Sequence, residues 1–310
     1  MDSMRPIWTI AKKEFKTAFK DKVFMIITLL FLALSIVSVY IGSSTKNAEL
    51  KAYSDIVELL KSQGSQAFPP KPEIYPLAIL QNIIRYVSIV GAVLAIFLGF
   101  DTFSGEKENG TMKLLLSRPF YRDQLITGKL LGGGTVIGLL LLVTLIFNTT
   151  LFSVVSGLTP GVGEISRLVT FVFIAFFYMM SFYIATMFVS IKTSDRSFGF
   201  LMMLIFWVAV SFVIPQLAES QKSFAYAMNS TAQTVTQVPT DTVISKTIEI
   251  FSPTVHFQNI GGDLLQTVSE TANSSVGYIL QKRLLILMYM LAPGILLLFG
   301  SYRTFMKEVG

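Results

Sequence analysis

The stretch "DTFSGEKENGTMKLLLSRPFYRDQLITGK", from Asp101 to Lys129, is dense in charge, although long apolar runs stand on both sides of it. Those runs cover residues 77–100 and 130–152, and a helix needs about 17–25 apolar residues to cross a bilayer. A polar connection between two such runs predicts a helical membrane protein whose chain leaves the bilayer here and then re-enters it.

The composition is that of a membrane protein rather than of a soluble domain. Hydrophobic residues make up 52% of the 310 residues, charged residues make up 14%, and the mean hydropathy is +0.62. Soluble globular domains carry about 25% charged residues. Because the chain has no cysteine, disulfides, iron–sulfur clusters and thiolate metal sites are excluded.

Six apolar segments are long enough to cross a bilayer, so we expect an all-α membrane fold in a single transmembrane domain over residues 1–310. The expected spans are residues 23–41, 77–100, 130–152, 168–189, 198–214 and 284–302. The fifth span is short, and Pro215 is expected to end it. The first is expected to be retained, because its apolar run exceeds the roughly 7–15 residues of a signal-peptide core.

The distribution of Lys and Arg predicts the orientation. An even number of spans places both termini on one side, and fifteen of the 25 Lys and Arg residues lie on that side. Because basic loops favour the cytoplasm, we expect a multi-pass protein of the cell membrane with both termini and the 101–129 loop in the cytoplasm. Segments 42–76 and 215–283 are then extracytoplasmic.

Three segments outside the spans have patterns of their own. Residues 5–22 place aromatic and basic side chains at helical spacing, which predicts an amphipathic helix in the membrane interface. The residues expected to carry this behaviour are Lys12, Lys13, Phe15 and Phe19. Residues 42–76 predict a polar helix and then a proline-rich return, and residues 215–283 predict short helices packed over the outer ends of the spans.

Several kinds of chemistry lack the residues they need. The expected spans contain no ionisable acid, base or histidine except Arg85, which lies near an outer end where its side chain can reach the interface. Proton- or sodium-coupled transport and intramembrane hydrolysis would both need such groups inside the spans. The single histidine, His256, has no cluster of ligands around it, and Gly128-Lys129-Leu130 lacks the Ser or Thr of a phosphate-binding loop. We therefore expect no enzyme activity and no metal site.

Turn-forming and helical patterns alternate within the opening stretch. Residues 104–110, "SGEKENG", predict a turn, and residues 111–118, "TMKLLLSR", predict a short helix that Pro119 ends. A second helix then continues into the third span, where Gly128 and Gly132 permit close packing of another helix. From the residues alone, the short helix is either a transverse interfacial helix or a docking surface for a cytoplasmic protein.

The same stretch resembles the hallmark of the ABC type-2 permeases, the membrane subunits of ATP-driven exporters. In that family an E-x-x-x-G-T segment, a short leucine-rich helix, an R-P-x-x-R turn and a GK pair lead from the second span to the third. The matching residues are Glu106, Gly110, Thr111, Leu114, Leu115, Arg118, Pro119, Arg122, Gly128 and Lys129. The opening "IAKKEFK", Ile10 to Lys16, is similar to the interfacial helix of the family, whereas Phe120 and Tyr121 replace residues that are commonly small.

The resemblance implies a permease that lacks its own ATPase domain. Besides the lipid bilayer, its implied partners are two copies of a cytoplasmic ABC ATPase and a second permease subunit, expected to be an identical copy; no nucleic acid is expected. ATP and Mg²⁺ are then held by the partner subunits, and this chain binds no cofactor. The loop is the implied coupling helix, whose ATPase contacts are Glu106, Gly110, Thr111, Met112, Leu115, Leu116, Arg118 and Arg122.

Two functions remain open at this point. In the first, the chain exports a substrate along a path at the dimer interface, and apolar and aromatic walls favour an amphipathic, lipid-like or peptide substrate. In the second, it is an ATP-driven mechanotransmitter or a membrane anchor, and acts on an extracytoplasmic partner through residues 215–283 without transport.

Overall fold

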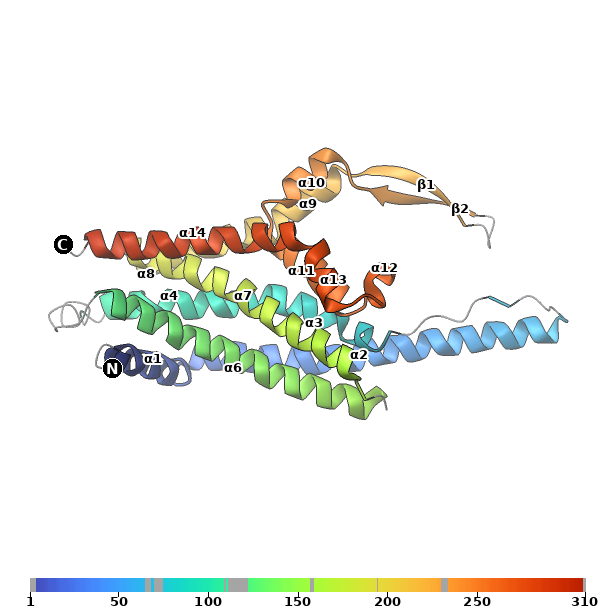
Figure 1. Ribbon diagram of the computed structural model, residues 1–310, viewed down its shortest axis with the longest axis horizontal. Coiled ribbons are helices and arrows are strands. Elements are labelled where there is room, and N and C mark those ends of the chain that lie inside the picture. The colour runs from blue at the N-terminus through green and yellow to red at the C-terminus, as the bar shows by residue number, and fades with distance from the viewer. Residues whose placement is uncertain are drawn as a thin grey trace.

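The computed structural model describes residues 4–64, 68–69, 75–108, 110, 122–156, 159–193, 195–229 and 234–308. Six helical segments among these residues are long and apolar enough to cross a membrane, which confirms the expected all-α membrane fold (Figure 1). They are Lys22–Ser62, Pro76–Glu108, Asp123–Val154, Val162–Lys192, Arg196–Ser220 and Leu284–Phe305.

The elements of the first half of the chain are α1 (Met4–Ala18), α2 (Lys22–Ser62), the 3₁₀ helix η1 (Pro76–Leu80), α3 (Gln81–Tyr86), the π helix η2 (Val87–Gly91), α4 (Ala92–Glu108) and α6 (Arg122–Ser156). Those of the middle are α7 (Val162–Lys192), α8 (Arg196–Val208), the π helix η3 (Ala209–Val213), α9 (Ile214–Ser220), β1 (Ser223–Asn229) and β2 (Thr234–Thr240). The last are α10 (Val243–Glu249), α11 (Pro253–Leu264), α12 (Ser269–Ala272), α13 (Val276–Lys282) and α14 (Leu284–Glu308).

The long helices form one bundle around α7. This helix contacts α4, α6, α8, α11 and α14, and its Tyr178 and Tyr183 are fully buried. Helix α1 and the C-terminal end of α14 lie at one end of the bundle, together with the last turn of α4 and the first turn of α6 (Figure 1). We call this the terminal end. The outer half of α2 and the β1–β2 hairpin extend at the opposite end (Figure 1).

The interfacial helix predicted over residues 5–22 ends before Phe19. Asp21 begins α2 instead, because its carboxylate accepts a hydrogen bond from the backbone N–H of Phe24 (2.9 Å) and so caps that helix. Phe19 therefore lies in the turn between the two helices, and its ring centre is 5.0 Å from that of Phe15.

The polar helix expected within residues 42–76 is present, but it is continuous with the helix of the first span. Helix α2 continues for 41 residues and is about 60 Å long, twice the thickness of a hydrocarbon layer. No proline interrupts it, and Gly42 remains helical where the carbonyl oxygen of Ile79 lies against its Cα. The outer half of α2 therefore extends beyond the bundle (Figure 1).

Two further boundaries differ from the sequence prediction. The turn expected at residues 104–110 does not begin at Ser104, because α4 stays helical to Glu108 and makes the ion pairs described below. Pro215 does not end the fifth span, because the π turn η3 precedes it and α9 continues to Ser220. A wide π turn accommodates a proline, which has no N–H to donate and whose ring clashes with a regular preceding turn.

The segment 215–283 contains the expected short helices α10–α13, but Ser223–Asn229 and Thr234–Thr240 form two paired antiparallel strands instead. Ser223 pairs with Thr240 and Asn229 pairs with Thr234. The sequence of β2, "TVTQVPT", is rich in β-branched residues, which favour strands.

Candidate functional site

A buried ammonium group joins three helices near the terminal end. Lys129 of α6 is fully buried, and its Nζ lies 3.0 Å from Oε1 of Glu14 on α1 and 3.0 Å from Oε1 of Glu106 on α4. It also donates a hydrogen bond to the backbone carbonyl of Thr102 (2.5 Å) and lies 4.8 Å from the centre of the Phe103 ring. A lysine is almost never fully buried unless it is paired, so these carboxylates hold it in place.

A second lysine balances the charge. The Nζ of Lys13 lies 2.6 Å from Oε1 of Glu106 and 3.9 Å from Oε1 of Glu14. Partial burial by itself would lower the pKa of Lys13, but the hydrogen bond from its ammonium to Glu106 and the attraction of both carboxylates outweigh this and raise the pKa above its ordinary value. Two cations therefore face two anions. We call Lys13, Glu14, Glu106 and Lys129 the ionic cluster.

Tyr183 attaches the ionic cluster to the centre of the bundle. Its hydroxyl donates a hydrogen bond to the backbone carbonyl of Lys129 (2.9 Å) and lies 3.2 Å from the hydroxyl of Thr102. The ring is buried against Gly133, where any side chain on that residue would overlap it. Helices α4, α6 and α7 therefore meet at one tyrosine.

Lys107 ties the last turn of α4 to the end of α7. Its ammonium donates hydrogen bonds to the backbone carbonyls of Ser190 (2.9 Å), Ile191 (2.5 Å) and Thr193 (3.1 Å). The last carbonyls of a helix have no partner within the helix, and a cation is favoured near them by the helix dipole. Lys107 therefore acts as a C-terminal cap supplied by another helix.

Arg196 makes a second connection between the same elements. This first residue of α8 lies 3.0 Å from Oδ1 of Asp101 through one guanidinium nitrogen and 2.5 Å from Oε2 of Glu108 through another. The two acids are seven residues apart, so they lie on the same side of α4 two turns from each other. These ion pairs explain why α4 does not end at the predicted turn.

Close backbone approach holds α1 against α6. A Cβ atom on Gly128 would lie 2.7 Å from Cβ of Ile10, and a Cβ atom on Gly132 would lie 2.6 Å from Cβ of Glu14. Real Cβ atoms essentially never come so close, so the two glycines let α1 approach near enough for Glu14 to reach Lys129. The predicted close-packing glycines thus pack within the chain.

The predicted coupling residues are placed in different ways. Glu106 is only 8% exposed and belongs to the ionic cluster. Gly110 has a φ of +67°, which favours glycine, and its N–H donates to the carbonyl of Lys107 (3.2 Å). Arg122 begins α6. The others, Thr111, Met112, Leu115, Leu116 and Arg118, lie outside the described residues.

Sequence reasoning missed Glu14 and used Lys129 only as part of a motif. The sequence holds two features that indicate an ion pair between helices. Glu14 is the single acid in a basic helix, and Lys129 adjoins glycines that allow another helix to pack closely. Neither feature identifies the partner, since Lys129 and Glu14 are 115 residues apart in the chain. Lys12 and Phe15 of the same helix instead line an apolar hollow of about 480 Å³ between α1 and α6.

A second buried cation connects the elements of the opposite end. Arg167 was expected outside the fourth span, but it lies within α7 and is buried. Its guanidinium donates hydrogen bonds to the backbone carbonyls of Asp263 (3.0 Å), Thr271 (2.9 Å) and Ala272 (2.8 Å), among others. The buried carboxylate of Asp263 in turn accepts a hydrogen bond from Nε of Arg283 (2.6 Å). These contacts fix α11–α13 over α7.

The two π turns, η2 and η3, are linked by a buried network of hydrogen bonds around Tyr178 and Thr254. The hydroxyl of Tyr178 donates to the carbonyl of Ser88 in η2 (2.8 Å) and lies 3.1 Å from the hydroxyl of Thr254 on α11. Thr254 in turn lies 2.8 Å from the hydroxyl of Ser211 in η3. These hydrogen bonds therefore connect spans two and five through Tyr178 of α7 and Thr254 of α11.

Among the residues that the structure describes, no three His, Asp or Glu side chains form a group that could hold a metal ion. The ionic cluster has two carboxylates, and both are paired with lysines. Its arrangement suits mechanical bracing of α1, α4 and α6.

Comparisons with known proteins place the chain in a family. The model of a family described as "ABC-2 family transporter protein" matches residues 8–308. The chain is 29% identical over 140 residues to the "Probable ABC transporter permease protein NosY" of Pseudomonas aeruginosa, an alignment that covers 45% of this chain and 43% of that protein. It is 26% identical over 189 residues to the protein of the same description from Stutzerimonas stutzeri, which covers 57% and 60%. The matches thus span about half the length of these relatives. Since the family model matches nearly the whole chain, this chain belongs to the ABC-2 family of transporter proteins and is a membrane subunit of an ABC transporter.

Proposed function

We propose that this chain is a permease that couples ATP hydrolysis in separate nucleotide-binding subunits to the export of a substrate. In this proposal two ATPase copies dock at the terminal end, and a second copy of this chain completes a homodimer in the cell membrane. ATP and Mg²⁺ belong to the ATPase, and this chain contributes no catalytic group. Family membership supports an ATPase partner.

The observation that carries the proposal is the bracing on both sides of residues 109–121. The ionic cluster joins α4 and α6 to α1, while Lys107 and Arg196 join α4 to α7 and α8. A force applied to the connecting segment therefore reaches five helices, α1, α4, α6, α7 and α8. Loose attachments would absorb the displacement, whereas the buried ion pairs of Lys129 resist it.

Charge supports the orientation that the proposal needs. The terminal end carries α1, the C-terminal end of α14 and the ends of α4 and α6 that residues 109–121 connect, and fifteen of the 25 Lys and Arg residues lie in the segments assigned to this side. Basic segments favour the cytoplasm, where an ATPase finds its nucleotide.

Within residues 109–121 we assign the ATPase contact to an apolar anchor and a basic edge. The anchor is Met112, Leu115 and Leu116, and the edge is Arg118 with Arg122. Buried apolar anchors supply most of the affinity of an interface, and charges at its rim set the register. Glu106, which is paired inside the chain, braces this segment instead of contacting the ATPase.

The test separates docking from bracing. The chain is co-purified with an ABC ATPase from the same genome, and ATP hydrolysis is measured with and without the chain. We expect Leu115→Asp to abolish co-purification, because an unpaired carboxylate would enter an apolar contact. We expect Lys129→Met to preserve co-purification but to reduce the stimulation of hydrolysis, because the braced helices loosen.

The matched control is Lys16→Met, which removes an exposed lysine of α1 that lies outside the ionic cluster. It should leave both readouts unchanged. Unchanged co-purification and stimulation in Leu115→Asp would refute the docking contact, and full stimulation in Lys129→Met would refute the bracing role.

A second function is favoured by the shape of the opposite end. The outer half of α2 extends beyond the bundle, and the hairpin exposes the aromatic side chains of Phe224 and Tyr226. A mechanotransmitter or anchor would use such elements to hold an extracytoplasmic partner. Deleting the hairpin residues 223–240 tells the two functions apart: a mechanotransmitter loses its partner while ATP hydrolysis stays stimulated, and an exporter keeps its transport.

A further inference from the structure

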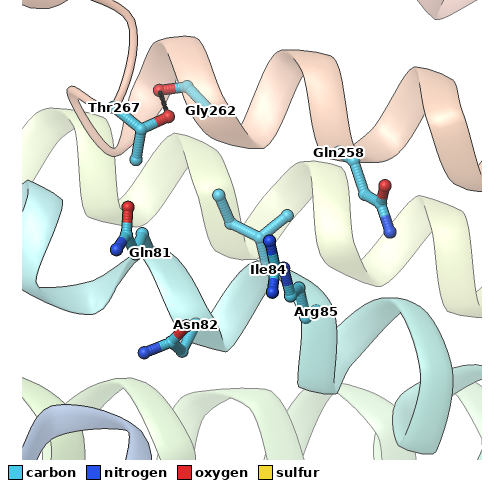
Figure 2. A pocket seen from close by; sticks show the side chains of 7 residues that line it. All are labelled: Gln81, Asn82, Ile84, Arg85, Gln258, Gly262 and Thr267. Carbon is cyan, nitrogen blue, oxygen red and sulfur yellow. Dashed lines mark hydrogen bonds between the residues drawn. The ribbon is translucent and has the colours of Figure 1, made fainter. Parts of the chain in front are cut away.

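A polar cavity of about 270 Å³ lies at the opposite end of the bundle, between α3 and α11 (Figure 2). It is lined by Gln81, Asn82, Ile84, Arg85, Gln258, Gly262 and Thr267. Figure 2 shows that two walls of the chain face each other here, since the first four residues belong to α3 and the others to α11 and the loop after it. All of these residues except Ile84 are polar or glycine.

The α3 wall is rich in hydrogen-bond donors. Arg85 is the one charged residue among those that line the cavity, and its guanidinium makes no hydrogen bond or ion pair within the described part of the chain. Gln81 and Asn82 add two carboxamide groups on the same wall, whose side chains likewise have no partner among the described residues. A guanidinium whose donors are free, and which has no ion-pairing acid among the described residues, matches an anionic group with several oxygen atoms.

The α11 wall presents acceptors. Gln258 donates a hydrogen bond from Nε2 to the hydroxyl of Ser88 (3.1 Å), so its carbonyl oxygen remains able to accept. Thr267 donates from its hydroxyl to the carbonyl of Gly262 (3.0 Å), as the dashed line in Figure 2 shows, so the lone pairs of that hydroxyl also remain. A ligand that satisfies both walls has an anionic group on one side and a hydroxyl or amine donor on the other.

The position of the cavity relative to the bilayer narrows the choice of ligand further. Arg85 lies near the outer end of the second span, with its longest apolar stretch beginning at Val87, so the cavity lies close to the outer interface of the membrane. Phosphate groups of a bilayer lie at this level, and the volume is below the roughly 300–1,000 Å³ of sites that enclose a whole drug-sized ligand. The cavity therefore suits a headgroup-sized molecule.

We propose that this cavity binds a phosphate monoester or diester group, with Arg85 pairing its charge and Gln81 and Asn82 donating hydrogen bonds to its oxygen atoms. The phosphate belongs either to a phospholipid headgroup or to a small soluble phosphate ester. The site is separate from the proposed ATPase contact, because it lies at the other end of the bundle, and it can be measured without an ATPase.

The experiment uses the 310-residue chain, purified in a maltoside detergent and stripped of lipid. In one arm, glycerol 1-phosphate is titrated and binding is measured by calorimetry. In the other arm, phosphatidylglycerol is added and retained lipid is counted by native mass spectrometry. Saturable binding in the first arm assigns a soluble ester, and retention in the second arm alone assigns a lipid headgroup.

Arg85→Gln should weaken binding at least about tenfold in the arm that is positive, because hydrogen bonds to a charged group are lost. Arg85→Lys keeps the charge but loses the planar guanidinium. Its affinity should therefore lie between that of the wild type and that of Arg85→Gln. The matched control is Arg303→Gln, which removes an exposed arginine at the terminal end. Size-exclusion profiles and melting temperatures verify that each variant is folded.

Three results would overturn the proposal. The first is an absence of saturable binding in both arms for the wild-type chain. The second is an Arg85→Gln variant that binds as the wild type does. The third is an equal loss in Arg303→Gln, which would indicate a general effect of net charge.

Discussion

Replacing Lys129 by Met tests the ionic cluster directly, because the substitution nearly preserves the volume of the side chain and removes its charge. Two carboxylates that each lie 3.0 Å from the ammonium, those of Glu14 and Glu106, lose this partner. Removing one member of a buried ion pair costs about 3–5 kcal/mol, since an uncompensated charge remains. Lys13 still lies 2.6 Å from Glu106, so we expect the lower end of this range, about 3 kcal/mol.

The assay is thermal unfolding of the purified chain in detergent, followed by the fluorescence of its two tryptophans, Trp8 and Trp207, and by circular dichroism. A loss of about 3 kcal/mol corresponds to a melting temperature lower by roughly 5–10 °C. The control Lys16→Met removes an exposed lysine and should stay within about 0.5 kcal/mol of the wild type.

A second substitution shows whether the charge itself is responsible. Glu106→Gln combined with Lys129→Met removes one of the two carboxylates that lose the ammonium, so the double variant should be more stable than the sum of the two single losses predicts, by about 1–3 kcal/mol. Strictly additive losses would refute the reasoning. So would a Lys129→Met variant that unfolds within about 1 kcal/mol of the wild type.

Three other predictions concern other parts of the molecule. Arg167→Met should lower the free energy of unfolding by about 3 kcal/mol or more, because several buried carbonyls lose their donor, and faster hydrogen exchange in α11–α13 would verify it. Gly132→Leu should displace α1, because its Cβ would lie 2.6 Å from that of Glu14; trypsin should then cleave α1 faster, whereas Gly163→Leu, at an open position, should not change cleavage. Burial lowers the pKa of His256, with a hydrogen bond to a backbone carbonyl partly opposing it. The folded state therefore binds the proton less readily than the unfolded state does, and this contribution to stability is complete above about pH 6.5 and is lost as the pH falls. His256→Gln should flatten the fall in melting temperature between pH 7 and pH 5, and an equal slope in both proteins would contradict the assignment.

Much of the fold could be predicted from local patterns. The six spans follow from runs of apolar residues, because a hydrocarbon layer admits only helices with few charges. Helix boundaries that depend on neighbouring helices could not be predicted from local patterns. Helix α4 continues past Asp101 because Arg196 binds that residue and Glu108, and nothing near Asp101 in the sequence indicates this arginine.

The candidate site could likewise be predicted only in part from the sequence. The motif from Glu106 to Lys129 identified the correct family, and its role as an ATPase contact stays a prediction. It did not show that Glu106 faces inward, because the lysines that bind it lie on other helices, 93 residues away in the case of Lys13. The paired strands β1 and β2 were also missed, because β-branched residues in a short polar segment favour a strand only where a partner strand lies beside it.

By itself, the sequence determined the membrane class, the six spans and the family, because hydropathy and short motifs are properties of contiguous residues. Tertiary structure decided which charges meet. A buried lysine is stable only where carboxylates from other helices reach it, and the approach of α1 to α6 at Gly128 and Gly132 brings one of them, Glu14, within 3.0 Å. The bracing of the connection between spans two and three is therefore a property of helix packing, which no local pattern encodes.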